Sequence, residues 1–273
     1  MYTFYTQVDS PLHRLNPLSK FLMPLPVVFF VALTTDPWIP IAFLIFVSLI
    51  LLLLGNIPLK RYLKLITPLF ALSSGFLLIY PFVVRETLVN ETPLLFEMGF
   101  IHVYQGGMIF ALATALRIST LVLLSMMFTL TTDATDFIRA LIQQWRLPYK
   151  IGFGALAAFR FVPLLHSELQ LIRAAHRVRG VSDRGGLKGL YQQLSRYAVP
   201  LMATAIRQAE RTALTMDGRA FGAYEDRTYF RQFSFDSHDY LYIAGFWLLS
   251  LLIILSIWQA GLMGSLVVLQ YSQ

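Results

Sequence analysis

Residues 163–180 read PLLHSELQLIRAAHRVRG, and residues 200–220 read PLMATAIRQAERTALTMDGRA. Each segment opens with Pro-Leu and closes with an arginine beside a small residue. Apolar residues recur in both at steps of three and four, which is the period of an amphipathic helix and not of a strand. The pattern indicates a loose internal duplication of two helices that end at Val178-Arg179-Gly180 and at Gly218-Arg219-Ala220.

The helical pattern extends in front of both segments. The apolar stripe begins at Ala155 in the first helix and at Leu187 in the second. The glycines of Arg184-Gly185-Gly186 lie between the helices and permit a sharp reversal of the backbone. If Leu187 to Asp217 is one helix, it is about 46 Å long at 1.5 Å per residue, and Pro200 allows a kink in it.

The composition predicts an integral membrane protein. The chain has 273 residues, of which 56% are hydrophobic and only 14% are charged. Its mean hydropathy is positive and it holds several long apolar runs, a combination that soluble domains rarely show. The formal charge of +7 does not indicate nucleic-acid binding, because basic residues beside membrane spans mark the cytoplasmic side.

Several kinds of chemical site are absent from the sequence. The lack of cysteine excludes disulfides, thiolate metal sites and cysteine nucleophiles. The histidines do not form His-Glu-x-x-His or another compact ligand spacing, and no Gly-rich loop ends in the Gly-Lys-Ser/Thr that would bind ATP. We therefore predict no catalytic residue, no metal site and no cofactor site in this chain.

Five apolar segments are predicted to cross the membrane. They are Phe21–Leu33, Trp38–Leu54, Leu65–Val84, Gly107–Leu130 and Tyr240–Trp258. About twenty residues cross a hydrocarbon core ~30 Å thick, although Pro24 and Pro26 interrupt the short first segment. Leu262–Leu269 is too short to cross again.

Charges in the loops predict the orientation. Basic residues precede the third span and glutamates follow it: Lys60, Arg61 and Lys64, then Glu86, Glu91 and Glu97. Because lysine and arginine favour the cytoplasmic side, the glutamate-rich loop is predicted to lie outside. Five crossings then put the N-terminus in the cytoplasm and the C-terminus outside.

The segment after the fourth span is rich in arginine and has no clean apolar run of spanning length. Its first part, Asp133–Trp145, is predicted to be a short helix that starts at a threonine or aspartate cap. We predict an all-α polytopic membrane protein with about five transmembrane helices and a cytoplasmic pair of long amphipathic helices between spans four and five. The predicted regions are residues 1–130, with an N-terminal arm and four spans, 131–239, with the helix pair, and 240–273, with the fifth span and a tail.

Two charged residues have a functional and a structural interpretation. Arg117 lies near the middle of the fourth span, where a charge costs roughly 2.5 to 3.5 kcal/mol on insertion scales. It contacts a substrate or ion, or it pairs with backbone carbonyls or a partner subunit; we favour the second, because no acidic residue accompanies it in the spans. Asp217 is weak evidence for a metal-dependent phosphotransferase, since such a site needs several carboxylates on one helix face.

Arg179 and Arg219 also have two interpretations. An arginine in the last turn of a helix opposes the negative end of the helix dipole, which contributes about 0.3 to 1 kcal/mol. That effect explains one arginine better than two, each beside a small residue, Gly180 or Ala220, that lets another backbone approach closely. We favour docking of another protein, because the planar guanidinium can hold an acceptor or a carboxylate through two hydrogen bonds.

Four stretches together resemble a known family over nearly the whole chain. They are Ser10–Pro17 with Lys20, Leu130–Thr132, Arg160–Leu165 with Glu168, and the two arginine motifs. In order and spacing they are similar to the transmembrane T component of energy-coupling factor (ECF) transporters, the EcfT/CbiQ family. Arg160–Leu165 is similar to the family's Arg-Phe-x-Pro-Leu-Leu entry into a coupling helix. The arginines take the places of two Ala-Arg-Gly-like motifs at the tips of coupling helices.

The arginine motifs depart from the strict family form at neighbouring positions. Val178 replaces the first alanine, and Gly218 and Ala220 alter the second motif. Asp217 stands where the family has glutamate, and this shorter acid has less reach. The departures affect the expected packing at the tips, while both arginines are kept.

The resemblance implies a scaffold and not an enzyme. Two cytoplasmic ATP-binding cassette ATPases would hold the tips of the coupling helices, with ATP and Mg²⁺ on those subunits and not on this chain. A separate membrane S component would bind a vitamin, a vitamin precursor or a metal ion and would pack on this chain within the lipid. ATP hydrolysis would move the ATPases, and this chain would transmit that motion and tilt the S component. The implied location is the inner (plasma) membrane of a prokaryote.

Two other functions stay open at this point. An ordinary ABC importer permease would carry a Glu-Ala-Ala loop followed by Gly and Ile-x-Leu-Pro, which this sequence lacks. A membrane-embedded enzyme would show ATP hydrolysis, lipid phosphotransfer or proteolysis by the purified chain alone.

Overall fold

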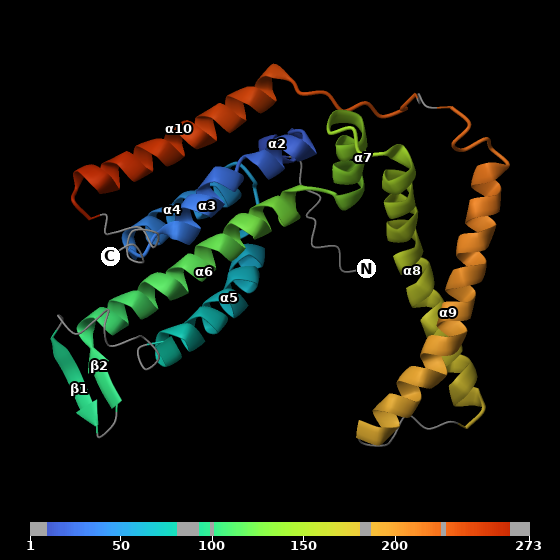
Figure 1. Ribbon diagram of the computed structural model, residues 1–273, viewed down its shortest axis with the longest axis horizontal. Helices are drawn as coiled ribbons and strands as arrows, with labels where there is room; N and C mark the ends of the chain where they lie inside the picture. The colour runs from blue at the N-terminus through green and yellow to red at the C-terminus, as the bar shows by residue number, and fades with distance from the viewer. Residues whose placement is uncertain (1–9, 81–92, 99–100, 181–186, 225–227, 263–273) are drawn as a thin grey trace. The chain divides into compact units, whose positions relative to one another are not determined.

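A computed structural model describes residues 10–80, 93–98, 101–180, 187–224 and 228–262 (Figure 1). It confirms the all-α polytopic fold and adds one short strand hairpin that the sequence analysis did not predict. The chain divides into two compact units. Residues 2–137 and 234–273 are called the bundle unit here, and residues 138–233 the helix-pair unit.

The bundle unit holds most of the apolar helices. Its elements are α1 (Pro11–Arg14), α2 (Pro17–Leu22), α3 (Leu25–Leu33), α4 (Trp38–Leu53), α5 (Leu59–Ile79), β1 (Leu94–Met98), β2 (Ile101–Tyr104), α6 (Gln105–Thr131) and α10 (Ser237–Gln259). Helix α6 packs against α3, α4 and α5. The antiparallel β1–β2 hairpin lies in the predicted outer loop and leads directly into α6. Glu86 and Glu91, on which the predicted orientation depends, lie outside the described residues.

Buried apolar side chains and a few hydroxyl contacts hold this unit together. Phe43 of α4 and Leu124 of α6 are among the fully buried side chains of its core. Thr120 of α6 donates a hydrogen bond to the Pro40 carbonyl of α4 at 2.9 Å. Such bonds between helices contribute about 0.6 to 2 kcal/mol each in a membrane, where water is not available as a partner.

Helices α5 and α10 begin several residues before their predicted apolar runs. Helix α5 starts at Leu59 and not at Leu65, so Lys60, Arg61 and Lys64 lie in its first turns. These side chains are exposed, so their charges do not interrupt the helix. Helix α10 starts at Ser237, three residues before the predicted Tyr240, because Asp236 and Asp239 form a capping box. Hydropathy alone marks the apolar part of a helix and misses its polar first turn.

Arg117 contacts backbone. Its Nη2 donates a hydrogen bond to the carbonyl of Thr34, the residue that follows the last turn of α3. The guanidinium therefore sits at the negative end of a helix dipole. This is the pairing with a backbone carbonyl that the structural interpretation of Arg117 predicts.

The helix-pair unit contains α8 (Tyr149–Val178) and α9 (Leu187–Asp217), preceded by most of α7 (Ala134–Gln144). As predicted, an aspartate caps α7, because Asp133 accepts a hydrogen bond from the Thr135 N–H at 2.8 Å. Helix α9 has the predicted bounds.

Both Pro-Leu steps lie inside helices, as the sequence analysis predicts for Pro200. Pro163 lies inside α8 and Pro200 inside α9. A proline inside a helix removes one hydrogen bond and kinks the helix, but the turns on both sides can continue it. The segment Arg160–Leu165 is accordingly the middle of α8 and not its beginning.

Four described helices, α5, α6, α8 and α10, are long and apolar enough to cross a membrane by length and composition. Helix α4 and the segment Pro17–Leu33 are shorter apolar helices. Helix α8 meets this criterion although the sequence analysis places it in the cytoplasm. Its second half carries Glu168, Arg173 and Arg177, and charges of this kind are rare within spans. Its cytoplasmic location stays a prediction, which labelling can test.

Candidate functional site

The first arginine ends α8. Arg179 is the C-cap residue, and its N–H donates to the Ala175 carbonyl at 3.3 Å. Gly180 follows in the left-handed region at φ 74°, and its N–H donates to the Arg177 carbonyl at 3.0 Å. Val178 is 89% exposed, and Arg179 and Gly180 are exposed as well. The α8 tip is therefore a tight, solvated helix end with an outward arginine.

The second arginine ends α9 in a Schellman motif. Ala220 has φ 55°, its N–H donates to the Asp217 carbonyl at 2.9 Å, and the Phe221 N–H donates to the Met216 carbonyl at 3.0 Å. These are the two hydrogen bonds that define the motif, with Ala220 at the position where glycine is usual. Arg219 directly precedes this left-handed residue, as Arg179 precedes Gly180. The two tips thus share a local geometry as well as a sequence pattern.

The chain after α9 packs back on the start of α8. The Phe221 ring meets the rings of Tyr149 and Phe153 edge-on, with centroids 5.7 Å apart in both pairs. The Tyr149 hydroxyl donates to the Tyr224 carbonyl at 3.2 Å. The C-terminal end of α9 therefore lies beside the N-terminal end of α8.

A second set of contacts joins the other ends of the pair. Tyr197 of α9 is 8% exposed. Its ring lies 5.6 Å from the His176 ring and 5.6 Å from the Arg173 guanidinium carbon, both of α8. Helices α8 and α9 are thus antiparallel, and they cross one another (Figure 1).

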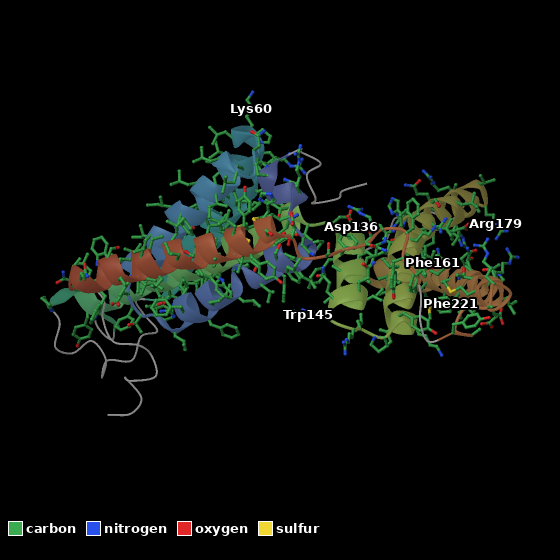
Figure 2. All side chains as sticks on the ribbon, turned by 90° about the horizontal axis from the view of Figure 1, so that it is seen from above. Lys60, Asp136, Trp145, Phe161, Arg179 and Phe221 are labelled. Atoms are coloured by element: carbon green, nitrogen blue, oxygen red, sulfur yellow. The ribbon has the colours of Figure 1, made fainter. Side chains whose placement is uncertain are left out.

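The antiparallel arrangement keeps the two arginine tips apart. Arg219 lies next to Phe221 at the start of α8, whereas Arg179 lies at its end; Figure 2 labels Arg179 and Phe221. The 30 residues of α8 separate these positions by about 45 Å at 1.5 Å per residue. The structure therefore holds two separate arginine sites and not one combined site.

Of the other predicted site residues, only Asp217 lies at a tip. Arg160 is exposed and Glu168 half-buried in the middle of α8, and Arg117 belongs to the bundle unit. Asp217 is exposed at the end of α9, where its backbone carbonyl accepts the Ala220 N–H. Only Val178–Gly180 and Gly218–Ala220, with Asp217, form the tips. Among the described residues, no group of three metal-ligating side chains occurs.

Phe221 and Tyr149, which help to hold the pair together, were missed by sequence reasoning. Phe221 directly follows the left-handed Ala220, which is the position where a Schellman motif commonly makes its apolar contact. That spacing is a signal the sequence analysis did not use. Tyr149 has no such local signal, since its role depends on a neighbouring helix. Tyr197 falls on the apolar stripe of the second helix, which the period of the sequence indicates.

Comparison with known proteins finds a matching family and several named relatives. A model of the CbiQ family, described as cobalt transport protein, matches residues 9–230. Three relatives are each named energy-coupling factor transporter transmembrane protein EcfT. That of Exiguobacterium sibiricum is 28% identical over 84% of this chain and 88% of its own length. That of Bacillus subtilis is 27% identical over 86% and 89%, and that of Lactococcus lactis is 24% identical over 92% and 95%.

The family match covers most of the chain, including both arginine tips. The matched relatives are named as transmembrane proteins, which agrees with the long apolar helices among the described residues. This family is a transporter membrane component and not a known enzyme family. The chain therefore belongs to the CbiQ cobalt transport protein family and is a transmembrane component of an energy-coupling factor transporter.

Proposed function

We propose that this chain is the scaffold that couples ATP hydrolysis by two cytoplasmic ATPase subunits to the movement of a substrate-binding S component. The observation that carries the proposal is the placement of Arg179 and Arg219 at opposite ends of an antiparallel helix pair. One acceptor cannot reach both tips across about 45 Å. Two ATPase subunits can contact both tips, because each subunit binds one of them. ATP and Mg²⁺ are held by those subunits.

Each tip suits a protein partner. An exposed guanidinium on a fixed helix end can donate two parallel hydrogen bonds to a carboxylate or to backbone carbonyls of an ATPase. The left-handed residue after each arginine turns the chain away, which leaves the tip open to a second backbone. An arginine that only opposes the negative end of its helix dipole would occupy the same positions. Substitution of both arginines distinguishes this interpretation from docking of an ATPase.

The contacts between α8 and α9 make the pair a lever. Phe221 ties α9 to the start of α8, and Tyr197 ties it near the other end. Aromatic pairs contribute about 0.5 to 1.5 kcal/mol each beyond the burial of their area. A force applied at either tip therefore moves both helices together.

The exposed apolar stripe of the pair supports a membrane partner. Leu171 of α8 and Val199, Met202 and Ile206 of α9 are each 63–66% exposed. Surfaces of this kind mark protein or membrane contacts. We assign the stripe to the S component that the family resemblance implies. The substrate class is then a vitamin, a vitamin precursor or a metal ion, recognised by that other polypeptide.

The proposed orientation puts the N-terminus and the helix pair in the cytoplasm and the C-terminus outside, in a prokaryotic plasma membrane. It rests on Lys60, Arg61 and Lys64, which are exposed at the start of α5. The family membership argues against a conventional ABC importer permease and leaves a membrane-embedded enzyme as the alternative. Turnover of ATP by the isolated chain would favour the enzyme.

Removing both guanidinium groups tests the proposal. We expect the Arg179→Ala/Arg219→Ala variant to release the ATPases or to uncouple hydrolysis from uptake. Leaving buried partner acceptors unpaired typically costs ~2 to 5 kcal/mol, and ~1.4 kcal/mol is a tenfold loss of affinity. Co-purification of the ATPases and uptake into vesicles are the measurements. Lysine at both positions should rescue only in part, since it keeps the charge and loses the planar fork.

The matched control is Arg211→Ala, an exposed arginine on α9 away from either tip. Arg173, which the sequence places on the polar face, is unsuitable because its guanidinium lies over the Tyr197 ring. The control should keep assembly and uptake. Full assembly and uptake by the double alanine variant would show that the arginines act only as helix cations.

A further inference from the structure

The N-terminal arm, residues 10–22, contacts both points at which the chain passes between its two units. The chain leaves the bundle unit through the end of α6 and the start of α7, before the boundary at Phe137, and this is called the outgoing segment. The chain comes back through Ser234 and the first turn of α10, and this is called the returning segment. All the contacts below lie within the bundle unit.

Lys20 and Phe21 of α2 hold the outgoing segment. Lys20 is 4% exposed, and its Nζ donates hydrogen bonds to the carbonyls of Thr131 at 2.8 Å and His13 at 2.9 Å. The Phe21 ring packs against Phe128 of α6 and Phe137 of α7, with both centroids 5.6 Å away. A buried ammonium group is costly unless it is paired, so Lys20 fixes the end of α6 in one position.

Asn16 and Ser19 hold the returning segment through Asp239. The buried Asp239 carboxylate accepts from the Asn16 N–H at 2.8 Å and from the Ser19 hydroxyl at 3.1 Å. The Asn16 side-chain amide donates to the Ser234 carbonyl at 3.1 Å. Asp239 also accepts from the Asp236 N–H at 3.0 Å and so closes the capping box of α10. The Asp239 carboxylate therefore caps the first turn of α10 and also accepts hydrogen bonds from the arm.

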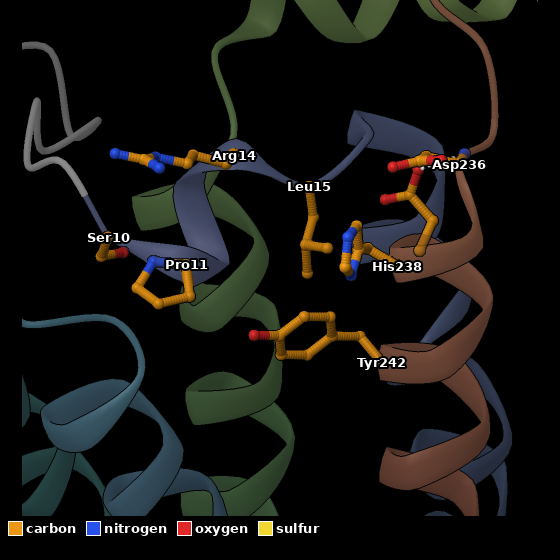
Figure 3. A pocket seen from close by; sticks show the side chains of 8 residues that line it. Ser10, Pro11, Arg14, Leu15, Asp236, His238 and Tyr242 are labelled. Atoms are coloured by element: carbon orange, nitrogen blue, oxygen red, sulfur yellow. Dashed lines mark hydrogen bonds between the residues drawn. The ribbon is translucent and has the colours of Figure 1, made fainter.

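A cavity lies between α10 and the rest of the arm. It has a volume of about 480 Å³ and is lined by Ser10, Pro11, Arg14, Leu15, Asp236, His238, Asp239 and Tyr242 (Figure 3). Figure 3 shows Arg14 and Asp236 on opposite sides of it. This gap separates only part of the arm from α10, because α2 packs against α10. The Asp239 contacts and the Asn16–Ser234 hydrogen bond join the arm to the returning segment.

We infer that Asn16, Ser19, Lys20 and Phe21, called the arm clamp here, fix both connecting segments where they leave the bundle unit. We assign Lys20 and Asp239 as positioning residues, which set where the helix pair is attached. The inference rests on the proposed function of that pair as a lever, because a lever transmits motion only when its attachment is fixed.

The clamp can be tested on the full chain without its partners. The natural sequence has no cysteine, so spin labels can be placed at Lys60→Cys in the bundle unit and at Ser195→Cys in the helix-pair unit, both exposed. Pulsed electron paramagnetic resonance then gives the distribution of distances between the units. We expect Lys20→Met to broaden this distribution and Lys20→Arg to restore part of its sharpness. Lys64→Met, at an exposed lysine of α5, is the matched control and should change nothing.

A second label pair separates positioning from general loss of stability. Lys60→Cys and Gln259→Cys both lie in the bundle unit and should keep a narrow distribution in the Lys20→Met chain. Equal broadening of both pairs, or broadening of neither, overturns the inference. If Lys20→Met fails to insert, the nearly isosteric Asp239→Asn supplies the same comparison.

Coupling in the complete transporter is the functional readout. With ATPases and an S component present, we expect Lys20→Met to lower the ratio of substrate taken up to ATP hydrolysed, while the ATPases still co-purify. Loss of co-purification would contradict a positioning role, and so would an unchanged ratio despite a broadened distribution. Failure of the proposed function appears differently: the double arginine variant then keeps full uptake, and the distance measurement still reports on the clamp.

Discussion

At the scale of single residues, the two arginine tips differ in how much strain they carry. Gly180 and Ala220 both adopt left-handed backbone, at φ 74° and 55°. Glycine does so without steric cost, whereas the Cβ of an L-residue approaches the following carbonyl oxygen and costs roughly 1–2 kcal/mol. The second tip is therefore the strained one.

We expect Ala220→Gly to stabilise the chain by up to about 1 kcal/mol. Glycine lowers the free energy of unfolding by ~0.4–1 kcal/mol, because it raises the conformational entropy of the unfolded chain. The relief of backbone strain at position 220 exceeds this loss. Gly180→Ala should have the opposite effect, about 1 kcal/mol of destabilisation, and the cost is purely conformational because no atom lies within 4 Å of an added Cβ. Thermal unfolding midpoints of the purified chain measure both.

The control for this pair is Ala209→Gly, at an exposed position inside α9. Glycine in a helix interior lowers stability by roughly 0.5–1 kcal/mol relative to alanine. If Ala220→Gly lowers the midpoint as Ala209→Gly does, Ala220 carries no relievable strain.

At the scale of elements, the turn between α7 and α8 is closely packed. Gly152, in the first turn of α8, is buried against Ile142 of α7. A Cβ added at Gly152 would lie 2.3 Å from Ile142 Cγ1, closer than two carbon atoms can approach. The absence of a side chain at Gly152 therefore allows the two helices to meet.

Gly152→Ala is expected to destabilise the helix-pair unit by about 1–3 kcal/mol, the usual cost of overpacking. Gly154→Ala is its matched control: nothing lies within 4 Å of the added Cβ, so the better helix propensity of alanine should stabilise by roughly 0.5–1 kcal/mol. Thermal unfolding of both variants is the measurement. Adding Ile142→Ala to Gly152→Ala should recover part of the loss, and the prediction fails if the two glycine variants behave alike.

At the scale of the whole molecule, the membrane topology depends on whether α8 crosses. Five crossings without α8 leave the start of α9 in the cytoplasm and the end of α10 outside. A sixth crossing by α8, which its length and composition allow, would reverse both positions.

Single cysteines distinguish these topologies. We expect Gln259→Cys, exposed at the end of α10, to react with an impermeant thiol reagent in intact cells. Ser195→Cys, exposed on α9, should react only after the cells are permeabilised. The unsubstituted chain has no cysteine and serves as the background control. The reverse labelling pattern would place α9 outside and would remove the proposed ATPase sites.

Local features of this protein followed from the sequence because neighbouring residues set them. The period of apolar residues predicted α9 with its observed bounds, and Asp133 was within the predicted cap of α7. The arginines were predicted to end both amphipathic helices, which they do. Helical period and capping depend on side chains within about one turn, so they can be read without knowing the fold.

Only the tertiary structure decided what these helices place together. Nothing in the sequence pairs Phe221 with Tyr149, or Asn16 with Asp239, which are 223 positions apart in the chain. Contacts of this kind have no period, because they depend on which surfaces remain after the local structure has formed. The sequence therefore determined that two helices end in arginine. The antiparallel packing of those helices decided that the arginines form two distant sites.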